Sequence, residues 1–489
     1  MKNKIKIIIS LSFCLLMSVS CKKEYLTPVP QTSITDITSF DTPERVLNQV
    51  RSIYQALKNG NFYGGRFQVY GDIRADDFIN ETTNGVTGFD VWNLNPLGTS
   101  QNSVKNLWSQ AYYTINLCNL FIDGMAAKGS VVVGTTLSAN YLGEARMIRA
   151  LSYYSLLQLY ARPYADGNGS KPGLPLRLTG IKGPGFSDLA RSTVAEVYTQ
   201  ILSDLNFAES NLPLTNGTDE LNTTRAHRNT AIALKTRVYL SMQNYASVIT
   251  EANKIVPQSV APFKATSGVA DSLQPNITTI FLTKYNTTES IFSLPMTSNT
   301  GDNPGTQNQL GFYFVRNGSS LGAAEYSLNT SGILANTNWS ATDVRRTALV
   351  YTNATTTKKF LAKYQAPSPY LDYAPVIRYS EVLLNLAEAL ARTNAAVDAR
   401  GLALVNAVRK RSDPATTVVA ATQQDLINAV MLERRIELLG EGLRNNDIMR
   451  LLQTIPAKGS VAAKAPSETG YIWPISSDEM SLNRLMTDN

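Results

Sequence analysis

The sequence predicts a mainly α-helical protein whose helical body is interrupted by an irregular, loop-rich lobe with short β-strands. In one late segment, apolar residues recur every three or four positions, as on one face of a helix: Val376, Tyr379, Leu383, Leu386 and Leu390. Between residues 257 and 375 this periodicity is lost, and Asn, Thr, Ser and Gly dominate. Because helical patterns flank this stretch, we expect residues 376–489 to complete a body that begins at 41–256.

Start signals and apolar stripes predict the individual helices. Asp41-Thr42-Pro43-Glu44 supplies a cap and a first-turn proline for a helix that ends near Lys58. Further helices are predicted over 104–125, 139–161, 193–212, 230–242 and 245–256. A second C-terminal stripe consists of Leu426, Ala429, Leu432, Ile436 and Leu439. Two short runs in the lobe are β-like, namely Ser290–Leu294 and Phe312–Val315.

Residues 229–256 resemble a tetratricopeptide helix pair. Small and large apolar residues alternate there in blocks, and the alanines allow two helices to approach closely. No run of fixed-length repeats accompanies the pair. The resemblance implies stacked helical hairpins that form a right-handed superhelical body.

The N-terminus has the pattern of a lipoprotein signal. Lys2, Lys4 and Lys6 precede a mostly apolar segment, and the small residue Ser20 stands before Cys21. We therefore predict a signal peptide at 1–20, a lipid anchor on Cys21 carrying acyl chains such as palmitate, and a polar tether at 21–40. A secreted protein cleaved near Ser20 is the alternative.

Composition limits the classes of partner. The chain has 489 residues, of which 43% are hydrophobic and 17% charged, as in globular proteins. Its formal charge of +7 falls to +4 when the three signal lysines are removed. This small excess contains no basic run, so nucleic acid is not an expected partner. Cys118 would be the only free cysteine of the mature chain, which excludes an internal disulfide.

Catalytic and metal motifs are weak. Gly318-Ser-Ser320-Leu-Gly322 fits a nucleophile elbow, but the only histidine, His227, precedes the serine, whereas an α/β-hydrolase needs it afterwards. One histidine and one free cysteine cannot form a usual zinc site. Glycosidase carboxylate pairs stay open, because their separation depends on the tertiary structure. We expect no enzyme activity, no cofactor and no metal.

Several segments together resemble the SusD/RagB family of outer-membrane nutrient-binding lipoproteins. They are the lipid cysteine with Tyr25-Leu26, residues 144–160, 377–389 and 433–444, and Trp473-Pro-Ile475. The resemblance implies a surface lipoprotein that captures an oligosaccharide and delivers it to a SusC-like TonB-dependent transporter. A peptide-binding relative of the RagB branch and a structural lid without ligand affinity are the alternatives.

Charged residues of the 433–444 segment are expected to have structural roles. Arg434 with Glu437 and Glu441 with Arg444 have the i,i+3 spacing of helix ion pairs, and bridges between helices would explain the others.

Candidate ligand residues follow from the chemistry of sugars. Sugar rings stack on aromatic planes, and their hydroxyls need amide, carboxylate or guanidinium partners. Such residues gather in the loop region after the first helix and in the lobe, the regions from which the family draws its ligand face. The candidates are Trp92, Asn95, Asp72, Arg74, Tyr70, Phe312, Tyr313 and Trp339.

Overall fold

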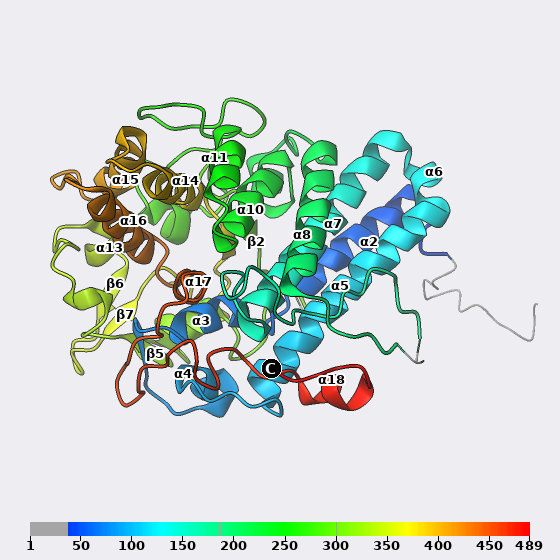
Figure 1. Ribbon diagram of the computed structural model, residues 1–489, viewed down its shortest axis with the longest axis horizontal. Helices are drawn as coiled ribbons and strands as arrows, with labels where there is room; N and C mark the ends of the chain where they lie inside the picture. The colour runs from blue at the N-terminus through cyan, green and yellow to red at the C-terminus, as the bar shows by residue number, and fades with distance from the viewer. Residues whose placement is uncertain (1–37, 184, 186, 300) are drawn as a thin grey trace, which may run out of the picture.

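A computed structural model describes residues 38–183, 185, 187–299 and 301–489 and has the predicted mainly helical architecture (Figure 1). The predicted signal peptide, Cys21 and most of the predicted tether lie outside these residues. Among the described residues, no helix combines the length and apolar character needed to cross a membrane.

The body is a succession of packed helices, as predicted. Its first part contains α2 (Pro43–Leu57), α5 (Asn106–Gly124), α7 (Thr135–Tyr160), α8 (Val194–Asn211), α10 (Arg228–Ser241) and α11 (Tyr245–Asn253). Its last part contains α14 (Tyr379–Thr393), α15 (Ala399–Ser412) and α16 (Gln423–Glu437). Each of these helices packs on the next one named, and α14 contacts both α15 and α16. Since α11 packs directly on α14, the C-terminal helices continue the stack begun before the lobe.

Shorter helices connect these elements. They are α3 (Arg66–Ile73), η2 (Gly85–Thr87), α4 (Phe89–Trp92), η3 (Gln101–Lys105), η4 (Met125–Gly129), α6 (Ser130–Val133), α9 (Asp219–Thr224), η5 (Thr279–Thr283), α12 (Leu310–Phe314), η6 (Ile333–Ala335), α13 (Val344–Thr347), α17 (Arg444–Arg450) and α18 (Ser477–Leu482).

Helix starts follow the sequence signals. Thr42 caps α2, and its Oγ1 accepts a hydrogen bond from the Arg45 backbone N–H at 3.3 Å. Thr193 and Glu196 form a reciprocal capping box at the start of α8. These side chains satisfy backbone donors that the first helical turn leaves without an internal partner.

The described strands are short and form two-stranded antiparallel sheets. The pairs are β1 (Phe78–Asn80) with β5 (Tyr326–Leu328), β2 (Phe292–Leu294) with β8 (Ala374–Ile377), β3 (Arg316–Asn317) with β4 (Ser320–Leu321), and β6 (Val350–Thr352) with β7 (Lys359–Leu361). The β-like run at 290–294 is confirmed by β2. The prediction for Phe312–Val315 was wrong, because Phe312 to Phe314 end the short helix α12. The division into a body at 41–256 and 376–489 and a lobe at 257–375 stays a prediction.

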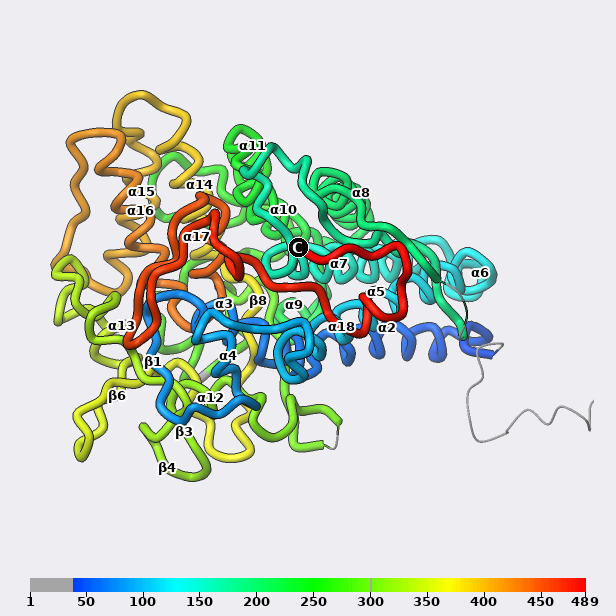
Figure 2. The backbone as a smooth tube through the Cα atoms, turned by 60° about the horizontal axis from the view of Figure 1, so that its bottom comes forward, coloured from blue at the N-terminus to red at the C-terminus, as the bar shows by residue number. Residues whose placement is uncertain are grey.

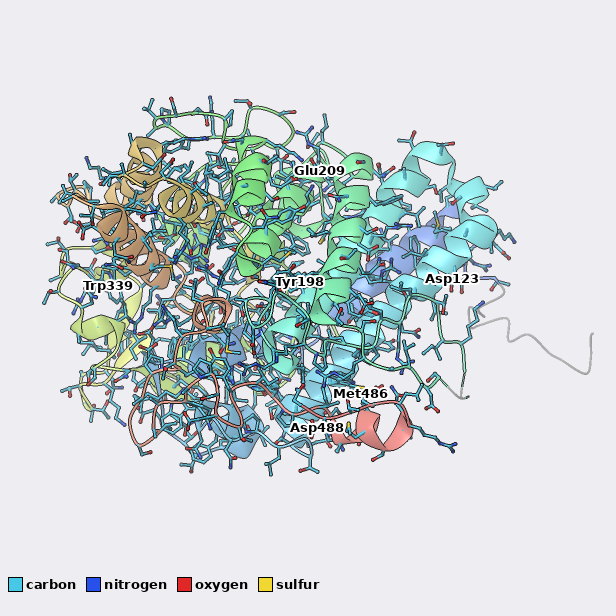
Figure 3. The ribbon with its side chains drawn as sticks, in the orientation of Figure 1. Asp123, Tyr198, Glu209, Trp339, Met486 and Asp488 are labelled. Atoms are coloured by element: carbon cyan, nitrogen blue, oxygen red, sulfur yellow. The ribbon has the colours of Figure 1, made fainter. Side chains whose placement is uncertain are left out.

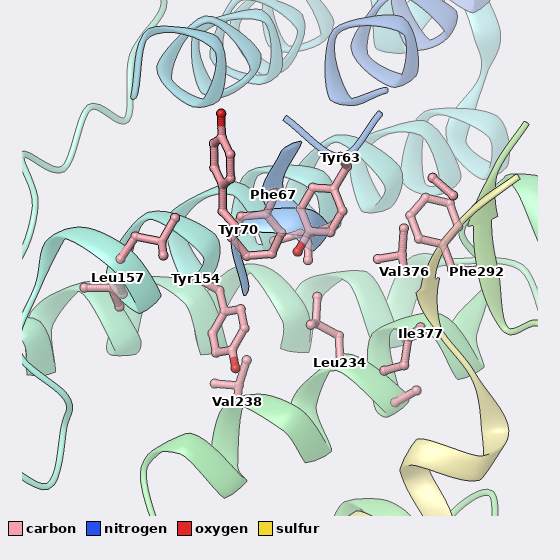
Figure 4. Close-up of a cluster of buried hydrophobic side chains, with 14 of the residues drawn as sticks. Tyr63, Phe67, Tyr70, Tyr154, Leu157, Leu234, Val238, Phe292, Val376 and Ile377 are labelled. Carbon is pink, nitrogen blue, oxygen red and sulfur yellow. The ribbon is translucent and has the colours of Figure 1, made fainter. Parts of the chain in front are cut away.

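One hydrophobic core joins these parts (Figure 4). Tyr63 and Phe67 lie between the side chains of α7 and those of α10 and β8. Two tyrosines of this core have paired hydroxyls: Tyr63 Oη lies 2.9 Å from Ser155 Oγ, and Tyr154 Oη lies 2.8 Å from Ser241 Oγ. Burial of these rings therefore leaves no phenol without a hydrogen bond.

A buried ion-pair network connects the lobe with the last helices. Glu437 at the end of α16 accepts hydrogen bonds from Arg345 at 3.0 Å, Arg378 at 2.9 Å and Arg411 at 2.6 Å. The network extends to five cations and five anions whose side chains are at most 5% exposed: Arg345, Lys363, Arg378, Arg409, Arg411, Glu289, Asp343, Glu433, Glu437 and Glu441.

Charge compensation keeps these buried groups ionised. Burial alone would raise the pKa of Glu437, but the charges of Arg411, Arg378 and Arg345 lower it well below its ordinary value. The sequence predicted bridges between helices, and these are present. The predicted i,i+3 pairs are absent from these residues. Arg434 pairs with Asp447 at 3.1 Å, and Arg444 pairs with Asp76 at 3.2 Å. Partners from other segments replace the local ones because these side chains point into the protein.

The network yields a stability prediction. Arg378→Met would leave Glu289, Glu437 and Glu441 short of a buried partner, so we expect a loss of about 3–5 kcal/mol in the free energy of unfolding, measured with urea. As a matched control, Arg51→Met removes a pair with Glu44 in which both side chains are more than 60% exposed, and should change the free energy by less than ~1 kcal/mol. Equal losses would contradict this account.

Candidate functional site

The two regions that supplied the predicted ligand residues meet in the structure. β1 from the loop region pairs with β5 from the lobe, with Phe78 opposite Leu328 and Asn80 opposite Tyr326. Behind this pairing, the rings of Phe78 and Phe314 lie 4.9 Å apart between centroids. The two regions are therefore adjacent, and their contribution to one ligand surface stays a prediction.

A buried carboxylate joins the two regions. Glu325, 2% exposed, lies just before β5. It accepts hydrogen bonds from Thr82 and from Thr87 Oγ1, at 2.6 Å for Thr87, on the N-terminal side. On the lobe side it accepts one from Asn317 Nδ2 at 3.0 Å. We call the surface around this contact, formed by residues 82–95 and 316–321, the junction face (Figure 2).

Four predicted ligand residues form the base of the junction and not its surface. Trp92 is 5% exposed, and its Nε1 donates a hydrogen bond to the Phe78 carbonyl at 2.9 Å. Tyr70 is fully buried and donates to the Asn102 carbonyl at 2.9 Å. Tyr313 is fully buried, and Phe312 is 8% exposed. In this conformation none of these rings presents a free face to a ligand.

Asp72 and Arg74 point to the C-terminal segment. Asp72 Oδ2 accepts a hydrogen bond from the Gly442 N–H at 2.7 Å, and Arg74 Nη1 donates to Asn445 Oδ1 at 2.9 Å. Burial raises the pKa of Asp72 to about 8, although the Gly442 hydrogen bond opposes the change. Burial lowers the pKa of Arg74 to about 10. These contacts connect α3 and the residue after it to α17 and to the turn before α17.

Trp339 lies apart from the other candidates, beside α13 (Figure 3). It is 2% exposed, and the guanidinium of Arg346 lies 5.4 Å from its ring centroid. Arg346 Nη1 also donates to the Trp339 carbonyl at 2.7 Å. The structure therefore does not bring Trp339 to the junction face.

Two asparagines and one phenylalanine are accessible on the junction face. Among the predicted candidates, Asn95 is exposed, as is its neighbour Asn93. Phe89, which the sequence reasoning missed, is half-buried and stacks on Trp92 with ring centroids 5.9 Å apart. Its position one helical turn before Trp92 was a signal, but the sequence does not show which ring faces outward.

Two other surface hollows fit a sugar less well. A cleft of about 580 Å³ between residues 336–340 and the α15–α16 hairpin is lined by Asn336, Asn338, Thr417 and Asn428, but by no aromatic ring. A smaller one of about 290 Å³ contains Tyr112 and Tyr113. Its polar side chains hold the neighbouring loop: Asn119 donates to the Arg177 carbonyl at 2.8 Å.

The positions of Ser320 and His227 do not support the nucleophile-elbow motif at 318–322 as a catalytic site. Ser320 is exposed on the β3–β4 hairpin, whereas His227 is fully buried at the start of α10, where burial lowers its pKa to about 4. A buried imidazole of this kind cannot take a proton from a serine at the surface. Within the described part of the chain, no group of three or more His, Cys, Asp or Glu side chains could hold a metal ion.

Family comparisons agree with this architecture. A family model described as the SusD family matches residues 325–489, and one described as starch-binding associating with outer membrane matches residues 24–240. A crystal structure of a SusD superfamily protein from Bacteroides fragilis is 32% identical, with a TM-score of 0.79, and the match covers 92% of this chain and 100% of that one. The chain belongs to the SusD family.

Three further proteins are less identical to this chain in sequence. A SusD-like protein of Formosa agariphila is 24% identical over 84% of both chains. A second from the same organism is 26% identical over 51% of this chain, and the match spans 45% of that relative's length. A surface glycan-binding protein from Bacteroides thetaiotaomicron, solved in complex with laminarihexaose, has a TM-score of 0.72 at 19% identity. That match covers 92% of this SusD-family chain and 99% of the other.

Burial of Trp92 predicts a structural effect in this SusD-family protein. Trp92→Ala removes a packed ring and leaves the Phe78 carbonyl without its hydrogen bond, so we expect a loss of about 3–5 kcal/mol in the free energy of unfolding by urea titration. Asn95→Ala changes an exposed side chain and should stay within ~0.5 kcal/mol. An unchanged midpoint for Trp92→Ala would contradict the buried position.

Asp72 predicts a pH dependence. Its pKa is higher in the folded chain, about 8, than the ordinary 3.8, so the folded state holds the proton longer. The resulting stabilisation is complete below about pH 4 and is lost as the pH rises to about 8. Asp72→Asn keeps an acceptor for Gly442 but does not titrate. The free energy of unfolding of the variant minus that of the wild type should therefore increase by more than ~1 kcal/mol between about pH 5 and pH 8.

Asp425→Asn is the control for this measurement. Asp425 is exposed, and hydrogen bonds with Thr422 lower its pKa, so its stabilisation is lost only as the pH falls below its ordinary titration range. Its difference from the wild type should stay constant over the same pH interval. A constant difference for Asp72→Asn as well would show that this carboxyl titrates normally.

Proposed function

We propose that this chain is a cell-surface glycan-binding lipoprotein that captures an oligosaccharide and delivers it to a SusC-like TonB-dependent outer-membrane transporter. Membership of the SusD family carries this proposal. The laminarihexaose complex of the Bacteroides thetaiotaomicron protein supports a glycan as the ligand, because that protein shares the fold. The proposed role is binding and transfer, without catalysis.

Anchoring through Cys21 would hold the protein at the outer membrane with its body facing the exterior. The signal pattern before this cysteine supports this part of the proposal. Each buried CH₂ of an acyl chain contributes about 0.8 kcal/mol, so several chains on one cysteine give a stable anchor.

The junction face is our proposed ligand surface. Phe89 supplies a partly accessible ring for a sugar face, and the amides of Asn93 and Asn95 can donate to and accept from sugar hydroxyls. Trp92 supports Phe89 from below, which fixes the ring before a ligand arrives. In this proposal Trp92 acts through Phe89, and Tyr70, Phe312 and Tyr313 hold the base on which both regions rest.

Charged side chains near this surface already make contacts within the chain. Glu81 pairs with Lys358, and Asp90 Oδ2 accepts a hydrogen bond from Ser103 at 2.5 Å. Arg316 donates to the Gln365 carbonyl at 3.1 Å. A neutral oligosaccharide therefore fits the surface better than a charged one, since it requires none of these pairs to break.

A binding screen of the chain starting at Lys22 tests the proposal. We would titrate neutral oligosaccharides, including laminarihexaose, and short peptides by calorimetry against the wild type, Phe89→Ala and Asn95→Ala. Loss of stacking on Phe89 should weaken glycan binding by about 1 kcal/mol, roughly a five-fold rise in Kd. Asn428→Ala, in the cleft of about 580 Å³, is the matched control for Asn95→Ala and should bind normally.

Other results would redirect the proposal. Weaker binding by Asn428→Ala alone would move the ligand to that cleft. Binding of peptides but not glycans would favour the RagB-type alternative. Absence of binding across both panels would favour a structural lid whose transporter recognises the ligand.

A further inference from the structure

The far end of the helical body carries a partly apolar tip, which we define as residues 126–137. It contains the end of η4, all of α6 and the start of α7. Val131 is 90% exposed and Leu137 is 44% exposed. Lys128 is the tip's one charged residue, and no Asp or Glu occurs in it. Single exposed apolar side chains are common on protein surfaces, and Val419 and Leu482 are each 81% exposed elsewhere on this one; at the tip, two occur within one short segment.

Internal packing explains only part of this composition. Three consecutive valines, Val131 to Val133, form most of the single-turn helix α6, although β-branched residues disfavour helix. No residue of α6 is buried. Beside the helix lies an open hollow of about 550 Å³ lined by Val131, Leu142 and Phe207 together with uncharged polar residues. Val131 therefore faces outward, whereas Val132 and Val133 pack against the core.

The described chain begins at this same tip. The ring of Phe40 lies 5.9 Å from that of Phe121 and packs so closely on Gly124 and Gly129 that a Cβ at either glycine would collide with it. Asp41 forms an ion pair with Lys128 at 2.5 Å. Figure 1 shows the start of the described chain beside α6. An anchor on Cys21 would lie within roughly 60 Å of Thr38, the reach of a fully extended chain.

We propose that the tip rests on the lipid surface that holds the anchor, with Val131 and Leu137 at the boundary between headgroups and acyl chains. This inference rests on the lipid anchor of the proposed function. A lipid surface fits because residues 126–137 have apolar side chains and no carboxylate, and the neighbouring carboxylate of Asp41 is paired with Lys128. Tethering keeps the tip at a high effective concentration near the lipid, so two small apolar side chains suffice for a persistent contact.

Such a contact would orient the whole protein. In Figure 1, α6 and the α15–α16 hairpin lie at opposite ends of the long axis. With one end touching the membrane, the body would lean from its anchor in one preferred direction and not rotate freely about the tether. The junction face would then be presented at a fixed angle to the membrane plane.

An environment-sensitive fluorophore at the tip tests the contact. Val131→Cys is labelled with nitrobenzoxadiazole in the chain starting at Lys22, in which the remaining Cys118 is buried and unreactive. A polyhistidine tag before Lys22 attaches the protein to vesicles that contain a nickel-chelating lipid, which replaces the natural anchor. Val419→Cys is the matched control, since that valine is 81% exposed and lies between α15 and α16 at the opposite end.

We expect emission from the label at 131 to shift to shorter wavelength on the vesicles, and emission from the label at 419 to stay unchanged. No shift at 131, or equal shifts at both positions, would overturn the proposal. With a label on Leu137→Cys, the added substitution Val131→Asp should reduce the shift. Circular dichroism of the same samples verifies that the fold is intact.

The lipid anchor is tested separately. Flotation of the full lipoprotein with vesicles, compared with Cys21→Ala, reports on the anchor alone. If flotation fails but the label at 131 shifts on nickel-chelating vesicles, the anchor is wrong and the tip still has affinity for lipid. If flotation succeeds without a shift, the anchor holds and the tip proposal is overturned.

Discussion

The placement of the lobe depends on a carboxylate, Glu437, that three arginines share. Arg345 and Arg378 come from the lobe and the segment after it, and Arg411 comes from α15. Isolated charges at this depth would be strongly unfavourable, so the lobe and the last helices must be assembled together for all of these groups to be satisfied. The short two-stranded pairs of the lobe could not fix its position themselves, because an isolated pair of strands is marginally stable in water.

The same helices also hold the N-terminal side of the junction face. Arg435 binds Asp77 with its Nε at 2.8 Å, and the backbone of Gly71 in α3 approaches that of Gly442 so closely that a Cβ would have no room. Both sides of the proposed ligand surface are thus positioned by residues 433–445. A sugar surface built in this way is rigid, which lowers the entropic cost of binding.

The sequence predicted helices well where the apolar stripe was long, and failed where it was short. The stripe of α14 is confirmed, except that Val376 belongs to β8. The run at 312–315 is apolar throughout, so its periodicity could not distinguish a strand from a buried helix. Residue chemistry located the regions that meet at the junction but not which side chains face outward. Trp92 and Tyr313 are suited to sugar stacking and equally suited to a core, and tertiary packing decides between the two uses. The partner of Arg444, Asp76, is likewise distant in sequence, and that of Arg434, Asp447, lies in the next helix.

The contact of α3 with the turn before α17 has a consequence for the order in which the protein folds. Residues 66–77 are among the first of the domain to be synthesised, yet their partners, Arg435, Gly442, Asn445 and Lys458, come more than 350 positions later. Contacts of such high sequence separation form slowly, because a long loop must close first. A chain threaded N-terminus first through a narrow pore would therefore remain without its central packing until almost all of it had emerged.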